Sequence, residues 1–210
     1  MAKYRVFVWL DTVVLPDSKV IAIALADDAS LGVLQSRVHA AWTLATCGWH
    51  GKGNDVTYNP TTCFETFPLP FVPGVQPATD PRVKAIADAA KNLDDLRTNW
   101  QNPPEWTREE LLEFPGTVGS PWSRYIVSGS EKKGIGTVRY PRTVPKDAEC
   151  AKKLEKRTLT NLYNERPTWL DLAHKRLDET VLAAYGWPTD LTDDQILERL
   201  LALNKVRAIQ

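Results

Sequence analysis

The chain has 210 residues, of which 43% are hydrophobic and 25% charged, an ordinary balance for a folded globular protein. The formal net charge is zero, which argues against a protein that coats nucleic acid with its whole surface but allows a local basic face. The apolar run Val20–Ala26 is far too short to cross a bilayer and no signal peptide is recognisable, so we expect a cytoplasmic protein without membrane contacts.

Cysteine usage favours a reducing compartment. Cys47, Cys63 and Cys150 are odd in number and widely spaced, so we interpret them as small buried hydrophobic side chains and not as a disulfide framework. Cys47, His50 and Cys63 are residue types that bind zinc, but a fourth ligand and a CxxC pair are missing. We therefore predict no metal site.

The first seventy residues mix strand and helix patterns. Tyr4–Leu10 and Lys19–Leu25 are rich in β-branched residues, which predicts two strands of a hairpin. Apolar residues at three- and four-residue steps then predict a helix from Ser30 to about Thr46. Trp49–Asp55 reads as a polar, Gly-rich loop, and Val56–Phe67 as a return to strand.

Prolines 68, 70, 73 and 77 predict an extended, unpaired backbone and hence a linker over residues 71–78. The linker separates a small β-containing domain, residues 1–70, from a second domain, residues 79–210. A unit of about seventy residues is marginally stable alone, so we expect part of its sheet to lie upstream.

The second domain is predicted to be mainly helical. Helices are expected over 81–100, 107–113, 147–163, 167–185 and from 193 to the end, with an irregular stretch over 114–140 that holds one short strand near Thr137–Tyr140. Asp80, Thr107 and Thr192 are the expected caps at three helix starts, and Gly186 is the expected residue after a helix end. The fold class is therefore α+β, mainly α.

One segment is similar to a catalytic motif. Asn102-Pro103-Pro104-Glu105 resembles the Asp/Asn-Pro-Pro-aromatic tetrapeptide with which amino-group DNA methyltransferases hold a flipped base. Glu105 occupies the stacking position, and no Gly-rich βα turn for a cofactor precedes it. We therefore favour a proline break between two helices and predict no cofactor-binding residues in this chain.

Hydrolase chemistry is not supported either. His39 and His174 fall within predicted helices, where hydrogen-bonded structural roles are commoner than catalysis, and no Gx-Ser-xG elbow or HExxH pair exists. Acidic residues cluster at helix caps. We predict no catalytic residue.

A local basic stretch is more informative. Residues 132–157 hold nine Lys or Arg against three Asp or Glu. A surplus of this kind on a loop and the start of a helix suits the gripping of DNA phosphates, although a solvated helix face explains it equally well. The candidate phosphate contacts are Lys132, Lys133, Arg139, Arg142, Lys152 and Lys153.

Two stretches resemble a known family. Tyr58–Pro68 (YNPTTCFETFP) resembles the segment that closes the target-recognition domain of MmeI-like type II restriction–modification methyltransferases. Leu159–Asn164 (LTNLYN), Arg166–Leu170 (RPTWL) and the block from Ala173 to Trp187 resemble the helical C-terminal domain of the same proteins.

The resemblance implies the C-terminal portion of an enzyme that methylates adenine N6 with S-adenosylmethionine, bound by an upstream domain absent from this sequence. The expected partners are double-stranded DNA and that upstream methyltransferase domain. Base-reading side chains of the family lie partly just before the Tyr-x-Pro-Thr-like strand. This implies base contacts from Lys52, Asn54, Asp55 and Thr57, in a loop that composition alone would class as ordinary surface.

Two other functions stay open. One is a structural module whose Trp-rich helical face packs on the catalytic domain without binding DNA, and the other is an autonomous methyltransferase that uses Asn102–Glu105.

Overall fold

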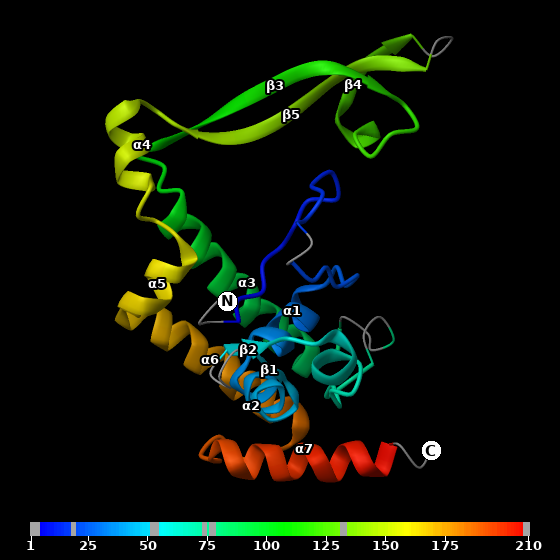
Figure 1. Ribbon diagram of the computed structural model, residues 1–210, viewed down its shortest axis with the longest axis vertical. Coiled ribbons are helices and arrows are strands. Elements are labelled where there is room, and N and C mark those ends of the chain that lie inside the picture. The colour runs from blue at the N-terminus through cyan, green and yellow to red at the C-terminus, as the bar shows by residue number, and fades with distance from the viewer. Residues whose placement is uncertain are drawn as a thin grey trace. The chain divides into compact units, whose positions relative to one another are not determined.

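The computed structural model describes residues 5–17, 20–50, 55–72, 75, 79–130 and 134–207. The chain divides into two compact units, both drawn in Figure 1. Unit 1 consists of residues 1–8, 21–96 and 162–210, and unit 2 of residues 9–20 and 97–161.

Unit 1 is a helical body with one short hairpin. It contains α1 (Asp28–Gln35), α2 (Arg37–Thr46), the π-helical turn η1 (Pro60–Phe64), α6 (Thr168–Tyr185), α7 (Asp193–Arg207), most of α3 (Pro81–Gln101) and the C-terminal half of α5 (Leu159–Glu165). Strands β1 (Gly48–His50) and β2 (Asp55–Thr57) pair antiparallel.

The core of unit 1 joins residues from both ends of the chain. Gly32 allows α1 to approach closely, because a Cβ at this position would lie 2.6 Å from Ile86 Cγ2 on α3 and 3.1 Å from Leu177 Cδ1 on α6. The core side chains, all at most 2% exposed, include Val33, Val38, Ile86, Leu93, Leu162, Leu170, Leu177, Val181, Leu182, Ile196 and Leu200. One continuous core of this kind is what stabilises a domain.

Three helix ends of unit 1 confirm the caps predicted from sequence. The Asp80 carboxylate accepts a hydrogen bond from the backbone N of Arg82 at the start of α3. Gly186 ends α6 in the left-handed conformation, at φ 71°, where a side chain would be strained. At α7, Thr192 Oγ1 accepts from Gln195 N and Gln195 Oε1 accepts from Thr192 N, a complete capping box.

Unit 2 is built on a long two-stranded ribbon. Strands β3 (Thr107–Thr117) and β5 (Ile135–Pro145) pair antiparallel along their whole length, and β4 (Ile126–Ser130) pairs with the start of β5. The short 3-10 helix η2 (Ser123–Tyr125) precedes β4. Helix α4 (Ala148–Leu154) follows β5, so it lies at the end of the ribbon opposite to β4 (Figure 1).

Unit 2 has little core. Val138 is the one aliphatic side chain without exposed surface among the described residues of this unit. Near it, the Trp122 ring packs edge-on against Phe114 and Tyr140, with centroids 4.9 and 5.3 Å apart. The Tyr125 hydroxyl donates to Asp11 Oδ2. Ring contacts and backbone pairing therefore carry much of the stability of this unit.

The predicted hairpin near the N-terminus is wrong for its described residues. Neither 5–10 nor 20–25 forms a strand. The backbone N of Phe7 donates to Gln35 Oε1 at 2.8 Å, a side-chain acceptor and not a neighbouring strand. β-Branched and aromatic content favours a strand only where a partner completes the ladder.

Two helices predicted as continuous are interrupted. The helix expected over 30–46 breaks at Ser36 (φ −76°, ψ 160°), whose Oγ donates to Val33 O and accepts from His39 N. The helix expected over 147–163 breaks between α4 and α5, where Thr158 Oγ1 accepts from Asn161 N. Hydroxyl side chains compete for backbone groups in this way and cap new helices.

The predicted helix 107–113 is also wrong, because this segment forms the first part of β3. Thr107 Oγ1 donates to Pro103 O and does not cap a helix. The stretch 114–140 was expected to be irregular with a short strand at its end, yet it contains β4 and about half of β5. Long-range pairing with β5 decided this region, which local pattern cannot show.

Around the hairpin β1–β2 the prediction was partly wrong. Trp49, His50 and Asp55 were expected in a loop but lie in the strands. The strand expected over 56–67 ends at Thr57, because Asn59 Oδ1 accepts from Thr61 N and Pro60 opens η1.

The fold class, α+β and mainly α, is confirmed. The limits of a recognition domain at 1–70, a linker at 71–78 and a helical domain at 79–210 stay a prediction. The two packing units divide the chain elsewhere, since α6 and α7 pack in the same unit as residues 21–72.

Candidate nucleic-acid interface

The β1–β2 hairpin carries the candidate base-reading residues. Its strands pair Gly48 with Thr57, Trp49 with Val56 and His50 with Asp55. Asp55 therefore begins β2 and Thr57 ends it. Lys52 and Asn54 belong to the connection 51–54, which lies outside the described residues. A two-stranded antiparallel ribbon is one of the elements that the major groove of DNA admits.

A buried histidine joins the segments on both sides of this hairpin. His39 of α2 places Nδ1 2.8 Å from Leu34 O, and its Nε2 lies 3.4 Å from Cys63 O and 3.3 Å from the Tyr58 hydroxyl. Burial lowers the pKa of His39 to about 4, so the ring is neutral at physiological pH. The same burial raises the pKa of Tyr58. His39 thus has a structural role, as its position in the sequence predicted.

The C-terminal helices hold the chain that follows the hairpin. The Tyr185 hydroxyl donates to Pro68 O at 2.9 Å, and Arg207 Nη1 donates to Leu69 O at 2.7 Å. Asn204 Nδ2 donates to Thr66 O. Residues 66–69 are therefore fixed by α6 and α7, although more than a hundred positions separate them in the sequence.

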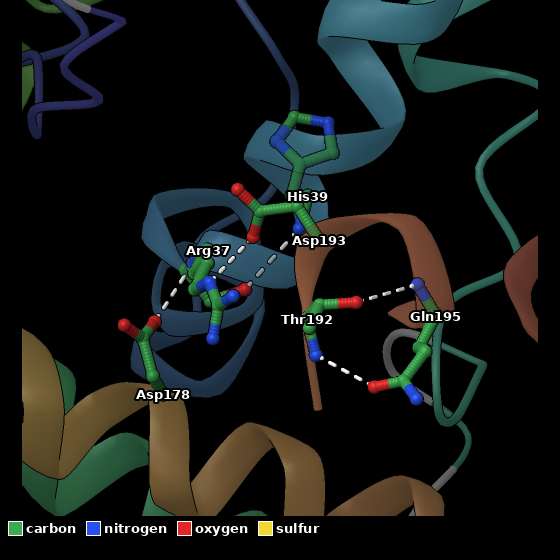
Figure 2. A network of polar contacts seen from close by, with 7 residues as sticks. Arg37, His39, Asp178, Thr192, Asp193 and Gln195 are labelled. Carbon is green, nitrogen blue, oxygen red and sulfur yellow. Dashed lines mark hydrogen bonds and ion pairs between the residues drawn. The ribbon is translucent and has the colours of Figure 1, made fainter. Parts of the chain in front are cut away.

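A polar network fixes the start of α2 (Figure 2). The backbone N of Arg37 donates to Asp178 Oδ1 on α6 at 2.7 Å, and Arg37 Nε donates to Asp193 Oδ1 on α7 at 2.5 Å. Burial raises the pKa of Asp178 to about 6, against the opposing effect of the Arg37 hydrogen bond. This carboxylate satisfies one of the orphan N–H groups of the first turn of α2.

In unit 2, the arginines of β5 are engaged across the ribbon. Arg139 Nε lies 2.6 Å from Glu113 Oε1, and Arg142 Nη2 lies 2.5 Å from Glu110 Oε1. Both arginine side chains are about half exposed. Lys132 and Lys133 lie outside the described residues.

The lysines of α4 differ from one another. Lys153 pairs with Glu149 at 2.8 Å, whereas Lys152 is exposed and makes no ion pair with another described residue. The structure thus places Arg139, Arg142, Lys152 and Lys153 in one unit, on two elements.

Trp106 connects α4 to the rest of unit 2. Arg157 stacks between two rings, with its guanidinium carbon 4.9 Å from the Trp106 centroid and 4.7 Å from that of Trp100. Lys153 Nζ lies 5.6 Å from the Trp106 centroid, and Arg157 Nη1 donates to Trp100 O. Cation–π contacts of this kind contribute about 0.5–1 kcal/mol each where they are exposed. No sequence pattern indicates this role of Trp106, because Arg157 is far from both tryptophans in the chain.

The segment Asn102–Trp106 is a turn in which Trp106 N and Thr107 N both donate to Pro103 O. It joins α3 to a strand, so the proline break was predicted correctly but not the helix expected after it. The Trp106 ring packs on Arg157 and Lys153.

Metal ligation finds no support in the described part of the chain, where no three His, Cys, Asp or Glu residues come together as a metal site would require. Cys63 is buried beneath His39. None of the helices that the structure describes is long and apolar enough to cross a membrane.

The N-terminal third of the chain matches the model of a known protein family. Residues 2–71 match the family model described as "MmeI, target recognition domain". This region is an MmeI-like target-recognition domain. No curated protein and no solved structure matches the chain. The match contains the β1–β2 hairpin and η1, and it supports a role in DNA recognition within a restriction–modification system. Residues 72–210 lie outside it, so the resemblance of the helical part stays a prediction.

Proposed function

We propose that this chain is the DNA-recognition and C-terminal portion of an S-adenosylmethionine-dependent adenine-N6 methyltransferase of a type II restriction–modification system, and that it is not catalytic by itself. The match of residues 2–71 to the MmeI target-recognition domain carries the proposal. The partners in this proposal are double-stranded DNA and an upstream methyltransferase domain that binds the cofactor, in the cytoplasm.

The hairpin gives the proposal a mechanism. Paired strands fix both ends of the connection 51–54, and the neutral His39 ties the helix before the hairpin to the turn after it. Lys, Asn and Asp side chains can read guanine, adenine and cytosine edges, respectively, in the major groove. We therefore assign base reading to Lys52, Asn54, Asp55 and Thr57, and backbone positioning to the basic residues of unit 2.

Selection of binding sites from a random duplex pool tests this function. The wild-type chain is expected to enrich a defined sequence. The variant Lys52→Ala/Asn54→Ala should change or lose that preference and keep non-specific affinity, because phosphate contacts remain. The matched control Lys91→Ala removes one lysine charge from α3, where Lys91 pairs with Asp95, and should enrich the wild-type sequence. An unchanged motif in the double variant would contradict the assignment of the base contacts.

A docking module that binds no DNA is the second candidate, and one observation favours it. Large apolar side chains of unit 2 are exposed along residues 9–15 and at residue 20, among them Leu15 at 94% and Val20 at 56%. Such apolar surface marks contact sites for other proteins. If the chain binds no duplex at low salt but self-associates in sedimentation experiments, this second function is correct and the first is not.

Autonomous methylation through Asn102–Glu105 has a separate test. We expect no heat in calorimetric titration of the chain with S-adenosylmethionine. Heat that the Asn102→Ala substitution abolishes would establish a cofactor site in this chain.

A further inference from the structure

The two basic elements of unit 2 differ in their charge balance. Strands β3 and β5 together carry three arginines (Arg108, Arg139, Arg142) and three glutamates (Glu109, Glu110, Glu113). Each of the three arginines forms an ion pair, Arg108 and Arg142 both with Glu110. The ribbon therefore presents no net charge to a polyanion.

The region around α4 has the opposite character. Lys146, Lys152 and Lys156 are exposed, and none of their ammonium groups forms an ion pair with a described residue. We call these three residues the α4 lysine cluster. Lys152 lies in the last turn of α4, and Lys156 directly follows the C-cap residue Glu155, whose backbone keeps αR dihedral angles, so about one turn of chain separates the two lysines.

The carboxylates nearby are largely engaged elsewhere. Asp147 Oδ1 accepts from Cys150 N at 2.7 Å as the cap of α4, and Glu149 pairs with Lys153. Glu155 is the remaining acidic residue of the stretch 146–157, and it makes no ion pair with a described residue. The cluster thus keeps a net positive charge.

The backbone that carries the α4 lysine cluster is held in place by a hydrogen bond and by side-chain packing. Lys146 N donates to Trp106 O at 2.9 Å, which extends the pairing of the ribbon to the start of α4. Cys150 is buried, and the Trp106 ring lies against Lys153 of α4 and against Arg157, which follows the helix. Fewer degrees of freedom are lost when a surface of this kind binds its ligand.

We propose that the α4 lysine cluster, and not the arginines of β5, is the surface of unit 2 that binds the phosphates of duplex DNA. This assignment rests on the proposed function. Exposed ammonium groups on α4 and directly before and after it, without an ion pair to a described residue, complement a phosphate backbone by charge, and each contact releases a condensed counterion. The ribbon arginines would first have to leave their glutamates.

Fluorescence anisotropy with a labelled duplex, measured over a range of salt concentrations, tests the assignment. Lys152→Gln/Lys156→Gln should weaken binding by about tenfold at 0.1 M salt and reduce the slope of log K against log salt by about 2. Arg139→Gln/Arg142→Gln removes the same charge from the ribbon and should have less than about a third of that effect. Lys84→Gln/Lys91→Gln is the matched control, since both lysines are exposed on α3 and pair with an aspartate four residues later.

The outcomes separate this inference from the proposed function. If the ribbon variant weakens binding as much as the cluster variant, or more, the cluster is not the phosphate surface, while DNA recognition stands. An equal loss in the α3 control would overturn the assignment as well, because general charge would then explain the effect. Absence of duplex binding by the wild-type chain would overturn both. Thermal melting of each variant checks that the fold is retained.

Discussion

Unit 1 and unit 2 are stabilised by different interactions. In unit 1, buried side chains from α1, α2, α3, α6 and α7 form one core, and Tyr185 bonds to Pro68 across 117 positions of sequence. In unit 2, backbone pairing, half-exposed aromatic rings and exposed ion pairs hold a ribbon that has one fully buried aliphatic side chain among its described residues. The proposed base reading would therefore be carried by the unit with the larger buried core, and the proposed phosphate contact by the unit with more exposed charge.

The region that matches the recognition domain depends on helices outside it for its packing. The matched region 2–71 does not pack alone, since α1 contacts Leu177 of α6, and α7 holds residues 66 and 69. The C-terminal helices thus complete the fold of the segment that carries the hairpin.

The largest expected effect comes from filling the close contact in unit 1. Gly32→Val should lower the free energy of unfolding by about 3–4 kcal/mol, because the first added carbon already lies 2.6 Å from Ile86 Cγ2 and 2.9 Å from Ala90 Cβ. Chemical denaturation measures this loss. Gly119→Val in unit 2 is the control, since no atom lies within 4 Å of its added Cβ. Similar losses in the two variants would show that unit 1 is no more tightly packed than unit 2.

The free energy of unfolding is also expected to depend on pH through two groups of unit 1, by nearly as much as the loss in Gly32→Val. The folded-state pKa of Asp178, about 6, is above its usual 3.8, so its contribution to stability is present at low pH and is lost as pH rises through 6. His39 behaves oppositely: its pKa falls from 6.5 to about 4, so its contribution is present above 6.5 and is lost as pH falls to 4. The two groups change the free energy of unfolding in opposite directions as pH rises from 4 to 7, each by about 3 kcal/mol, so their effects offset each other.

Asp178→Asn should break this balance and keep the acceptor for Arg37 N. Relative to wild type, the variant is expected to gain about 3 kcal/mol between pH 4 and pH 7. Urea denaturation at several pH values in this window measures the gain. A constant difference between the two proteins across the window would mean that Asp178 titrates normally in the folded state.

The smallest effect is expected on the ribbon of unit 2. Arg142→Gln should cost less than about 1 kcal/mol, since its pairing with Glu110 is exposed to solvent, and the cost should fall further in high salt. A double-mutant cycle with Glu110→Gln isolates the pair. A coupling of several kcal/mol would indicate that ion pairs stabilise unit 2 far more than its exposure implies.

Features that depend on residues close together in the sequence were predicted correctly more often than features that depend on distant residues. The capping box of Thr192 and Gln195, the left-handed Gly186 and the start of α3 at Asp80 were predicted, because each depends on residues at most a few positions apart. Ser36 and Thr158 interrupt helices whose apolar period continues past them, so periodicity alone missed both breaks.

The candidate site was predicted only in part. Thr57 and Asp55 fall on β2, and Arg139 and Arg142 on β5, but the sequence did not show that both arginines face glutamates. Lys146 and Lys156 contributed to the predicted basic surplus without being singled out. Their spacing from Lys152 was visible, whereas the absence of ion pairs with described residues was not.

The sequence by itself determined three helix ends of unit 1, at Asp80, Gly186 and Thr192, the mainly helical class, and the resemblance of Tyr58–Pro68 to an MmeI-like recognition domain, which the family match confirms. These features depend on interactions between residues close in sequence and on motifs that can be recognised without knowledge of the fold. Only the tertiary structure decided that Thr107–Thr117 is a strand, that α6 and α7 complete the core of unit 1, and which cations are paired. Strand pairing, core packing and ion pairs join residues far apart in the chain, so no local pattern specifies them.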